Sequence, residues 1–188
     1  MKIHHISHAC FFIMALLMQP LWASDTEHDL VKEDSDTERG LVKEADEVLI
    51  NIAESVIKIP IAEGVSVEDA IDSMKLKANA LNMKFAGHQQ LSKQYKSIGM
   101  KDIQRTEIFQ FCDVRIAKKM LDFDIHFLAY MPCRVGVIED KKGQVWLITM
   151  NLNVFITSVD LPPELIKIAT EVRDNMEIIM EAGANGDL

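Results

Sequence analysis

Hydrophobic and polar residues follow one another along this chain with two different periods. Over residues 56–61 isoleucine occupies every second position, which predicts a β-strand, and Pro60 suits a strand at the edge of a sheet. From residue 67 to 81 apolar side chains recur every three or four positions, which predicts an amphipathic helix. Ser66, three residues before Asp69, is typical of the capping residue that starts such a helix.

The same two patterns predict the remaining elements. Further strands are expected over residues 83–87, 106–111, 134–139 and 145–150, with a helical turn or two over 92–98 and a short helix after Asp113. The turn at 140–143 predicts that the last two strands form an antiparallel hairpin. Pro162 and Pro163 open a long amphipathic helix over about 162–182, with Gly183 at its end. This order predicts an α+β domain, with helices covering one face of a mostly antiparallel sheet.

The first 23 residues have the order of a secretory signal peptide. Lys2 and several histidines precede an apolar run over 9–18, and a proline and a small residue, Ala23, follow it. Cleavage is expected after Ala23. The run is shorter than the roughly 18 to 20 residues that cross a bilayer, so an uncleaved anchor is the weaker alternative. A lipoprotein is weaker still, because Cys10 does not follow the apolar run as a lipid-modified cysteine would.

Residues 24–47 differ in composition from the rest of the chain. They hold ten acidic and three basic residues and no aromatic ones, too little apolar surface to offset the entropy of ordering. We therefore expect a mobile acidic spacer here, followed by one domain over 48–188. From the second half of this spacer into the domain, apolar residues have helical spacing and predict a leading helix; they are Leu41, Val48, Leu49, Ile52 and Val56.

The net charge limits the classes of partner. The whole chain carries a formal charge of −9, and Lys2 is the only charged residue of the leader, so its removal makes the chain more acidic still. Nucleic-acid phosphates and anionic lipid surfaces would be repelled by such a protein. We therefore expect no nucleic-acid and no anionic-lipid partner, and the charge does not name a positive partner. With the short apolar run of the leader, we also expect no stable membrane anchor.

Five short motifs occur in an order that resembles a known family. They are Val-Ser-Val-Glu-Asp-Ala-Ile at 65–71, Phe-Gln-Phe-Cys-Asp at 109–113, Met-Pro-Cys-Arg-Val at 131–135, Glu-Asp at 139–140 and Gly-Gln-Val-Trp at 143–146. Together, over about 56–151, they resemble the bacterial domain-of-unknown-function family 302 (DUF302). The resemblance implies a compact two-layer β-α-β-β-α-β fold, a periplasmic location and a homodimer, with the C-terminal amphipathic helix as an addition. It implies no catalytic residues.

Both cysteines of the mature chain depart from the family pattern. Cys112 stands where the family has a Gly-Asn turn, and Cys133 where it has the last residue of Leu-Pro-Leu. In an oxidising compartment a disulfide would close a loop of about 22 residues and stabilise the fold by roughly 3 kcal/mol. A simple parallel crossover between their strands would instead place them beyond the about 7 Å that such a bond requires. A disulfide, buried free thiols, and a redox or metal-binding pair all stay open.

A few other polar residues are candidates for a site. Asp122, Asp124 and His126 alternate with apolar residues, so in an extended segment they would point the same way and could bind a divalent metal ion. Packing of the apolar residues between them explains the alternation equally well. His88 is expected just beyond a strand, where it would join Asp113 and Arg134 at a groove beside the cysteines.

Motifs that are missing from the sequence also inform the functional interpretation. There is no Cys-x-x-Cys-His, thioredoxin-like Cys-x-x-Cys, glycine-rich phosphate loop, His-Glu-x-x-His or Gly-x-Ser-x-Gly. We therefore expect a periplasmic, non-enzymatic binding or accessory domain without a cofactor, whose partner is a periplasmic protein or a small molecule. The alternatives are a thiol-redox or metal-binding protein that uses Cys112 and Cys133, and an enzyme built from scattered residues.

Overall fold

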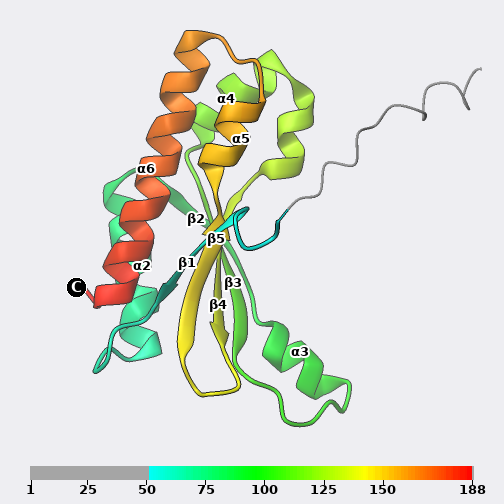
Figure 1. Cartoon of the computed structure of the whole chain (residues 1–188), viewed down its shortest axis with the longest axis vertical. Coiled ribbons are helices and arrows are strands. Elements are labelled where there is room, and N and C mark those ends of the chain that lie inside the picture. The colour runs from blue at the N-terminus through cyan, green and yellow to red at the C-terminus, as the bar shows by residue number, and fades with distance from the viewer. Residues whose placement is uncertain (1–50, 188) are drawn as a thin grey trace, which may run out of the picture. The chain divides into compact units, whose positions relative to one another are not determined.

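A five-stranded sheet runs through the part of the chain that the computed structural model describes, residues 51–187 (Figure 1). Its strands are β1 (Val56–Pro60), β2 (Lys84–Gln89), β3 (Thr106–Cys112), β4 (Cys133–Glu139) and β5 (Val145–Met150). They lie in the order β1-β5-β4-β3-β2, and every neighbouring pair is antiparallel. The prediction of an α+β domain built on an antiparallel sheet is confirmed.

Two helices cover one face of this sheet, α2 (Val67–Ala80) and α6 (Pro163–Asn185) (Figure 1). Because side chains alternate across a strand, every second residue of the central strands points at these helices. The fully buried side chains between the two layers include Met74, Phe109, Phe111, Val135, Val137, Leu147, Ile179 and Met180. The predicted cap of α2 is confirmed, since Ser66 Oγ accepts a hydrogen bond of 3.0 Å from the backbone N–H of Asp69.

A second, smaller core lies beyond one end of the sheet. It is formed by α4 (Val114–Phe123), the 3-10 helix η1 (Ile125–Tyr130), α5 (Leu152–Ser158) and the first half of α6 (Figure 1). Its buried residues are Met120, Phe127, Leu161 and Leu165. Neither η1 nor α5 was predicted from the sequence.

The segment 122–126 is not extended, although the metal-binding hypothesis for it requires an extended segment. Asp122 lies in the last turn of α4, and Asp124 is the capping residue of η1. The carboxylate of Asp124 accepts a hydrogen bond of 2.8 Å from the backbone N–H of His126. This local bond starts a new helical turn, because an aspartate that binds its own backbone competes with strand formation.

The chain enters the sheet through a turn rather than a helix. Residues 52–54 form a turn, and Val56 already pairs with Met150 in the ladder between β1 and β5. The predicted leading helix therefore does not extend to Val56. Its earlier residues, the signal peptide and the acidic spacer lie outside the described residues. Within residues 51–187 no helix is long and apolar enough to cross a bilayer.

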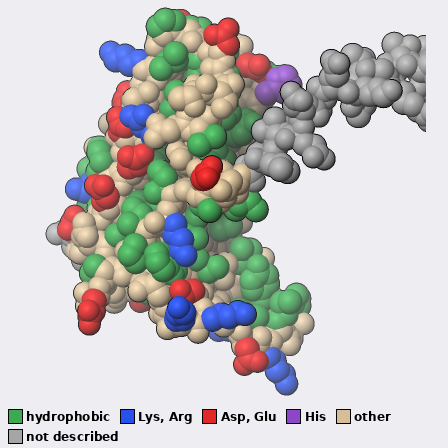
Figure 2. Space-filling view, in the orientation of Figure 1, with side chains coloured by type: hydrophobic (Ala, Val, Ile, Leu, Met, Phe, Trp, Pro, Cys, Tyr) green, Lys and Arg blue, Asp and Glu red, His purple; other side chains and the backbone are tan. Residues whose placement is uncertain are grey.

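Within residues 51–187 the opposite face of the sheet is largely uncovered. In that part of the chain only the short helix α3 (Leu91–Ser97) lies beside it, and α3 contains no buried residue. Figure 2 shows hydrophobic side chains across the middle of the view and on the lobe at the lower right, where α3 lies next to several Lys and Arg side chains. Both edge strands are irregular, since β1 ends at Pro60 and β2 has a bulge between Phe85 and Gly87.

Gly183 has a different role from the one predicted. Helix α6 continues past it to Asn185, and Gly186, with a φ of 68°, is the left-handed cap. Gly183 is buried where α6 meets α2. A Cβ at this position would lie 2.4 Å from Met74 Cγ and 3.1 Å from the carbonyl oxygen of Ala70. The glycine therefore permits the close approach of the two helices.

We expect Gly183→Ala to lower the free energy of unfolding by about 1 to 3 kcal/mol, because the added methyl group overpacks the contact with α2. The sign is informative, since the same change in an ordinary helix position stabilises by about 1 kcal/mol. Urea unfolding followed by circular dichroism measures the difference. Glu181→Ala, at an exposed position of the same helix turn, is the control and should change stability by less than about 0.5 kcal/mol. A more stable Gly183→Ala protein would contradict the close packing.

Candidate functional site

Cys112 and Cys133 lie at the same end of the sheet. Cys112 ends β3 and Cys133 begins β4, and these strands are antiparallel neighbours in which Cys133 pairs with Phe111. The parallel crossover that would have separated them does not occur, because the chain returns through α4 and η1. Both cysteines are free thiols in the structure.

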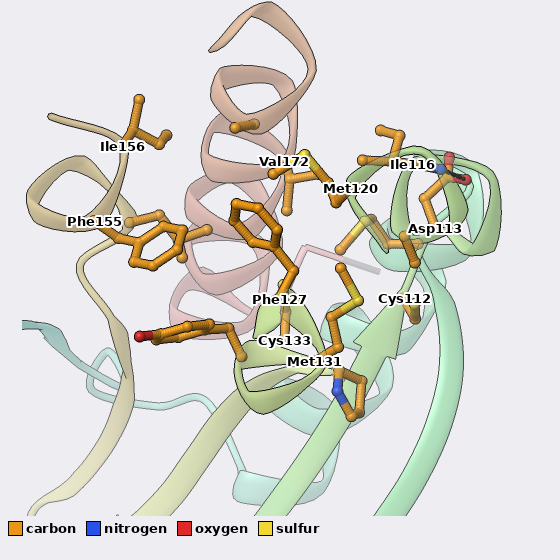
Figure 3. A pocket seen from close by; sticks show the side chains of 16 residues that line it. Cys112, Asp113, Ile116, Met120, Phe127, Met131, Cys133, Phe155, Ile156 and Val172 are labelled. Carbon is orange, nitrogen blue, oxygen red and sulfur yellow. Dashed lines mark hydrogen bonds between the residues drawn. The ribbon is translucent and has the colours of Figure 1, made fainter. Parts of the chain in front are cut away.

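The two thiols line a cavity of about 90 Å³ between the end of the sheet and the second core (Figure 3). The other side chains around it are mostly apolar and include those of Ile116, Phe127, Phe155 and Val172. Asp113 lies at its edge, where its carboxylate accepts hydrogen bonds from the backbone N–H of Arg115 at 2.9 Å and from the Arg115 guanidinium at 2.7 Å. These bonds lower the pKa of Asp113. Asp113 therefore serves as the cap of α4.

Burial keeps both thiols protonated. Desolvation raises the pKa of Cys133 to about 11, and the neighbouring Cys112 contributes to the rise. Burial also raises the pKa of Cys112, with a further contribution from the charge of Asp113. Because the thiolate is the nucleophilic form of cysteine, neither residue is prepared for nucleophilic chemistry at neutral pH.

A larger cleft of about 740 Å³ lies on the uncovered face of the sheet. Its floor consists of side chains from the strands, and its ends are formed by Leu91 of α3 and by Tyr130, Val154 and Phe155 near the second core. The floor residues are Val56, Ile108, Gly136, Ile138, Ile148 and Met150. Five residues line both this cleft and the small cavity and form a wall between the two: Tyr130, Pro132, Cys133, Leu152 and Phe155.

Arg134 lines the cleft without a carboxylate partner. The other arginines of residues 51–187 all bind carboxylates: Arg105 binds Glu68 and Glu107, Arg115 binds Asp113, and Arg173 binds Asp174. The guanidinium of Arg134 makes no ion pair or hydrogen bond with any of the described residues. It is therefore an exposed positive charge in a mostly apolar cleft of an acidic protein.

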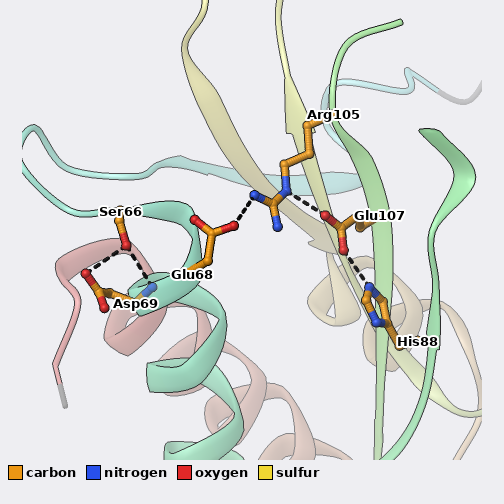
Figure 4. A network of polar contacts seen from close by, with 6 residues as sticks. All are labelled: Ser66, Glu68, Asp69, His88, Arg105 and Glu107. Atoms are coloured by element: carbon orange, nitrogen blue, oxygen red, sulfur yellow. Dashed lines mark hydrogen bonds and ion pairs between the residues drawn. The ribbon is translucent and has the colours of Figure 1, made fainter. Parts of the chain in front are cut away.

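A third group of polar residues surrounds the buried carboxylate of Glu107 (Figure 4). Its side chain is only 8% exposed, yet both oxygens are bound: Arg105 Nε donates to Oε1 at 2.5 Å, and His88 Nε2 lies 2.6 Å from Oε2. Arg105 Nη1 also donates to Glu68 at 2.7 Å, and the His88 ring stacks on Phe109. A cavity of about 210 Å³ adjoins the group.

The sequence did not lead to this network, although one signal was present. Glu107 occupies an inward-facing position of β3, in phase with Phe109 and Phe111. A charged residue in phase with buried aromatic residues must find partners inside the protein, since burying an unpaired charge is costly.

The structure separates the residues that were expected to form one groove. Asp113 lines the small cavity, Arg134 the open cleft, and His88 the cavity next to Glu107. His88 also lies within β2, not beyond it.

The three residues proposed as metal ligands are likewise engaged locally. Asp122 pairs with Lys118, and the carboxylate of Asp124 lies 2.6 Å from His126 Nδ1. Among residues 51–187 no three His, Cys, Asp or Glu side chains are grouped so as to hold a metal ion.

Comparison with known proteins identifies the family. The family described as "Domain of unknown function DUF302" matches residues 57–183, well over half of the chain. The chain belongs to the DUF302 family. The matched region includes most of α6, so the DUF302 domain extends beyond the 56–151 region of the sequence resemblance.

A solved DUF302 structure shows the same fold. It is the crystal structure of an uncharacterized conserved DUF302 protein from Bacillus stearothermophilus, with a TM-score of 0.59 and 11% sequence identity. The similarity covers 68% of this chain and 97% of that one. At this identity the likeness concerns the fold alone. The comparison with curated proteins found no match.

The raised pKa of Cys133 predicts slow thiol chemistry in the folded DUF302 domain. With a pKa of about 11, roughly one thiol in a thousand is ionised at pH 8. In a Cys10→Ser, Cys112→Ser variant, Cys133 should react with Ellman's reagent far more slowly in buffer than in urea. The native rate should rise about tenfold for each pH unit. A native rate at pH 8 equal to that of the unfolded chain would contradict the burial.

Glu107 and Glu68 allow a matched test of the polar network, because both bind Arg105. We expect Glu107→Ala to lower the free energy of unfolding by about 2 kcal/mol or more, since it leaves Arg105 and His88 without their buried partner. Glu68 is 71% exposed, and Glu68→Ala should cost less than about 1 kcal/mol. Urea unfolding in low and high salt measures both. Equal effects for the two variants would show that Glu107 is not a buried partner.

Proposed function

We propose that this DUF302 protein is an exported, non-catalytic binding domain that holds a small amphipathic anion in the cleft on the uncovered face of its sheet. The observation that carries the proposal is the position of Arg134, an arginine without a carboxylate partner among residues 51–187, in a cleft of about 740 Å³. Export to the periplasm and assembly as a homodimer, both expected from the sequence, are parts of the same proposal.

The volume of the cleft and its apolar floor suit the hydrophobic part of an amphipathic ligand. At about 740 Å³ it falls within the range of 300 to 1,000 Å³ that is typical of small-molecule sites. Gly136 lies on β4, the middle strand, and its lack of a side chain leaves the centre of the floor hollow. Ile138 and Met150 beside it keep 36% and 37% of their surface exposed, so a ligand would remove apolar area from water.

The charge in the cleft selects the ligand's head group. A guanidinium binds a carboxylate through two parallel hydrogen bonds, and such charge-assisted bonds are stronger than neutral ones. In a chain of net charge −9, an uncompensated positive charge among apolar side chains favours an anion at that point. We therefore infer a carboxylate head group on an aliphatic body.

The lining of the cleft favours binding over catalysis. Most polar residues that line the cleft, other than Arg134, carry hydroxyl or amide groups. Two residues are exceptions: Glu107 is bound by His88 and Arg105 on the other face of the sheet, and the thiol of Cys133 is protonated. The hydroxyl and amide groups can orient a ligand through hydrogen bonds, and none of them is a ready proton acceptor at neutral pH.

Decanoate and 1-decanol test the proposal, because they share an aliphatic chain and differ in the charge of the head group. We expect Arg134→Gln to weaken decanoate binding about tenfold or more, the loss that corresponds to one charge-assisted pair. Binding of 1-decanol should not change. Isothermal titration below the micelle-forming concentration of decanoate measures both ligands.

Two further variants make the decanoate test specific. Arg115→Gln is the matched control, since Arg115 already binds Asp113 and lies outside the cleft. Gly136→Val should weaken both ligands by filling the floor, and the position accepts a Cβ, whose nearest neighbour would be the carbonyl oxygen of Ile148 at 3.6 Å. The proposal is wrong if decanoate does not bind, or if Arg134→Gln leaves its affinity unchanged.

A further inference from the structure

Five sulfur-containing side chains line the 90 Å³ cavity beside the cysteine pair. They belong to Met83, Cys112, Met120, Met131 and Cys133. Met83 directly precedes β2, Cys112 ends β3 and Met120 lies in α4. Met131 lies between η1 and β4, and Cys133 begins β4. Figure 3 shows Cys112, Met120, Met131 and Cys133 around the same space. The fold therefore gathers sulfur atoms that the sequence spreads over about fifty residues.

Few other donor groups are available in this cavity. The only ionised side chain of its lining is Asp113, whose carboxylate is already bound to Arg115 and to the start of α4. The hydroxyl group of Tyr130 is the other polar group, and Tyr130 is 44% exposed. The remaining lining is aliphatic or aromatic apart from the imino acid Pro132. A cation that prefers oxygen ligands, such as Mg²⁺ or Ca²⁺, would find no suitable set here.

Thiolate and thioether ligands select soft metal ions, and Cu(I) is the biological ion that both favour. We propose that the cavity binds one Cu(I) ion between Cys112 and Cys133, with thioether ligands from the surrounding methionines. Both cysteine side chains line this cavity: Cys133 comes from the side of β4 that faces the helices, in register with Phe111, and Cys112 comes from the adjoining end of β3.

The charge of the ion matches the apolar cavity. Cu(I) bound to one thiolate and to neutral sulfur ligands forms a centre with no net charge, whereas an isolated ion in such surroundings would be strongly disfavoured. Binding replaces the proton of one thiol: the S–H bond breaks, an S–Cu bond forms, and the proton goes to solvent. No electron is transferred. Affinity should therefore rise with pH by about one proton per ion bound.

The test is an oxygen-free titration of the full chain with Cu(I) in competition with bicinchoninate, a coloured Cu(I) chelator. All variants carry Cys10→Ser, so that Cys112 and Cys133 are the only cysteines. We expect one high-affinity ion per chain. Cys112→Ser and Cys133→Ser should each weaken it by at least about a hundredfold, more than changes outside the ligand shell usually cause. Met131→Leu should have a smaller effect.

Matched controls separate this site from other sulfur atoms. Met100 and Met150 are 53% and 37% exposed and lie outside the cavity, so Met100→Leu and Met150→Leu should leave Cu(I) affinity unchanged. Circular dichroism confirms that each variant is folded, and Cys133→Val replaces Cys133→Ser if the latter unfolds. X-ray absorption at the copper edge should show sulfur ligands alone.

Two results would overturn the copper site. The first is Cu(I) binding that is as tight in both cysteine variants as in the parent chain, and the second is a coordination shell of nitrogen or oxygen atoms. The copper site would also be overturned if the parent chain could not take Cu(I) from bicinchoninate. None of these results bears on decanoate binding at Arg134, so the two proposals fail independently.

Discussion

The close packing of α2 and α6 on one face of the sheet is the constraint on which the rest of the structure depends. Gly183 lets the two helices approach until its backbone meets Met74 and Ala70. The main core is thereby completed by two helices on one face of the sheet. Among residues 51–187 little covers the other face, where an apolar floor and Arg134 line an open cleft.

The length of α6 explains why there is a second core. A helix of 23 residues is about 34 Å long, whereas a strand of seven residues spans only about 23 Å. The first half of α6 therefore extends past the end of the sheet, and α4, η1 and α5 pack around it (Figure 1). The cavity with Cys112 and Cys133 lies at the junction between these two cores.

Sequence patterns predicted the elements in which each side chain has one structural role, such as capping a helix, forming a turn or packing in the core. The cap at Ser66, the hairpin between β4 and β5 and the stripe of α2 were all confirmed, because each follows from local chemistry. The pattern was misleading where one residue type serves two purposes. Asp124 reads as the polar member of an alternating strand, but its carboxylate binds the backbone of η1. Gly183 reads as a helix end, but it is a contact point between helices.

The candidate sites were less predictable than the fold, because they depend on residues that are distant in sequence. Nothing local to Cys112 indicates that Met83 and Met131 lie around the same cavity. Likewise, nothing local to Arg134 shows that no carboxylate of residues 51–187 binds it. The departures of Cys112 and Cys133 from the family pattern had drawn attention to two residues that line this cavity. That they lie at the same end of the sheet, on antiparallel neighbouring strands, could be known only from the topology.

The two irregular edge strands have a consequence for the behaviour of the protein at high concentration. A straight, exposed edge strand offers unpaired backbone groups to other molecules and promotes sheet-to-sheet aggregation. Here β1 ends at Pro60, which has no backbone N–H to donate, and the bulge between Phe85 and Gly87 bends β2. Both edges therefore resist extension by a further strand. A domain whose sheet carries an apolar cleft floor benefits from this protection, because each strand added at an edge would extend that apolar face.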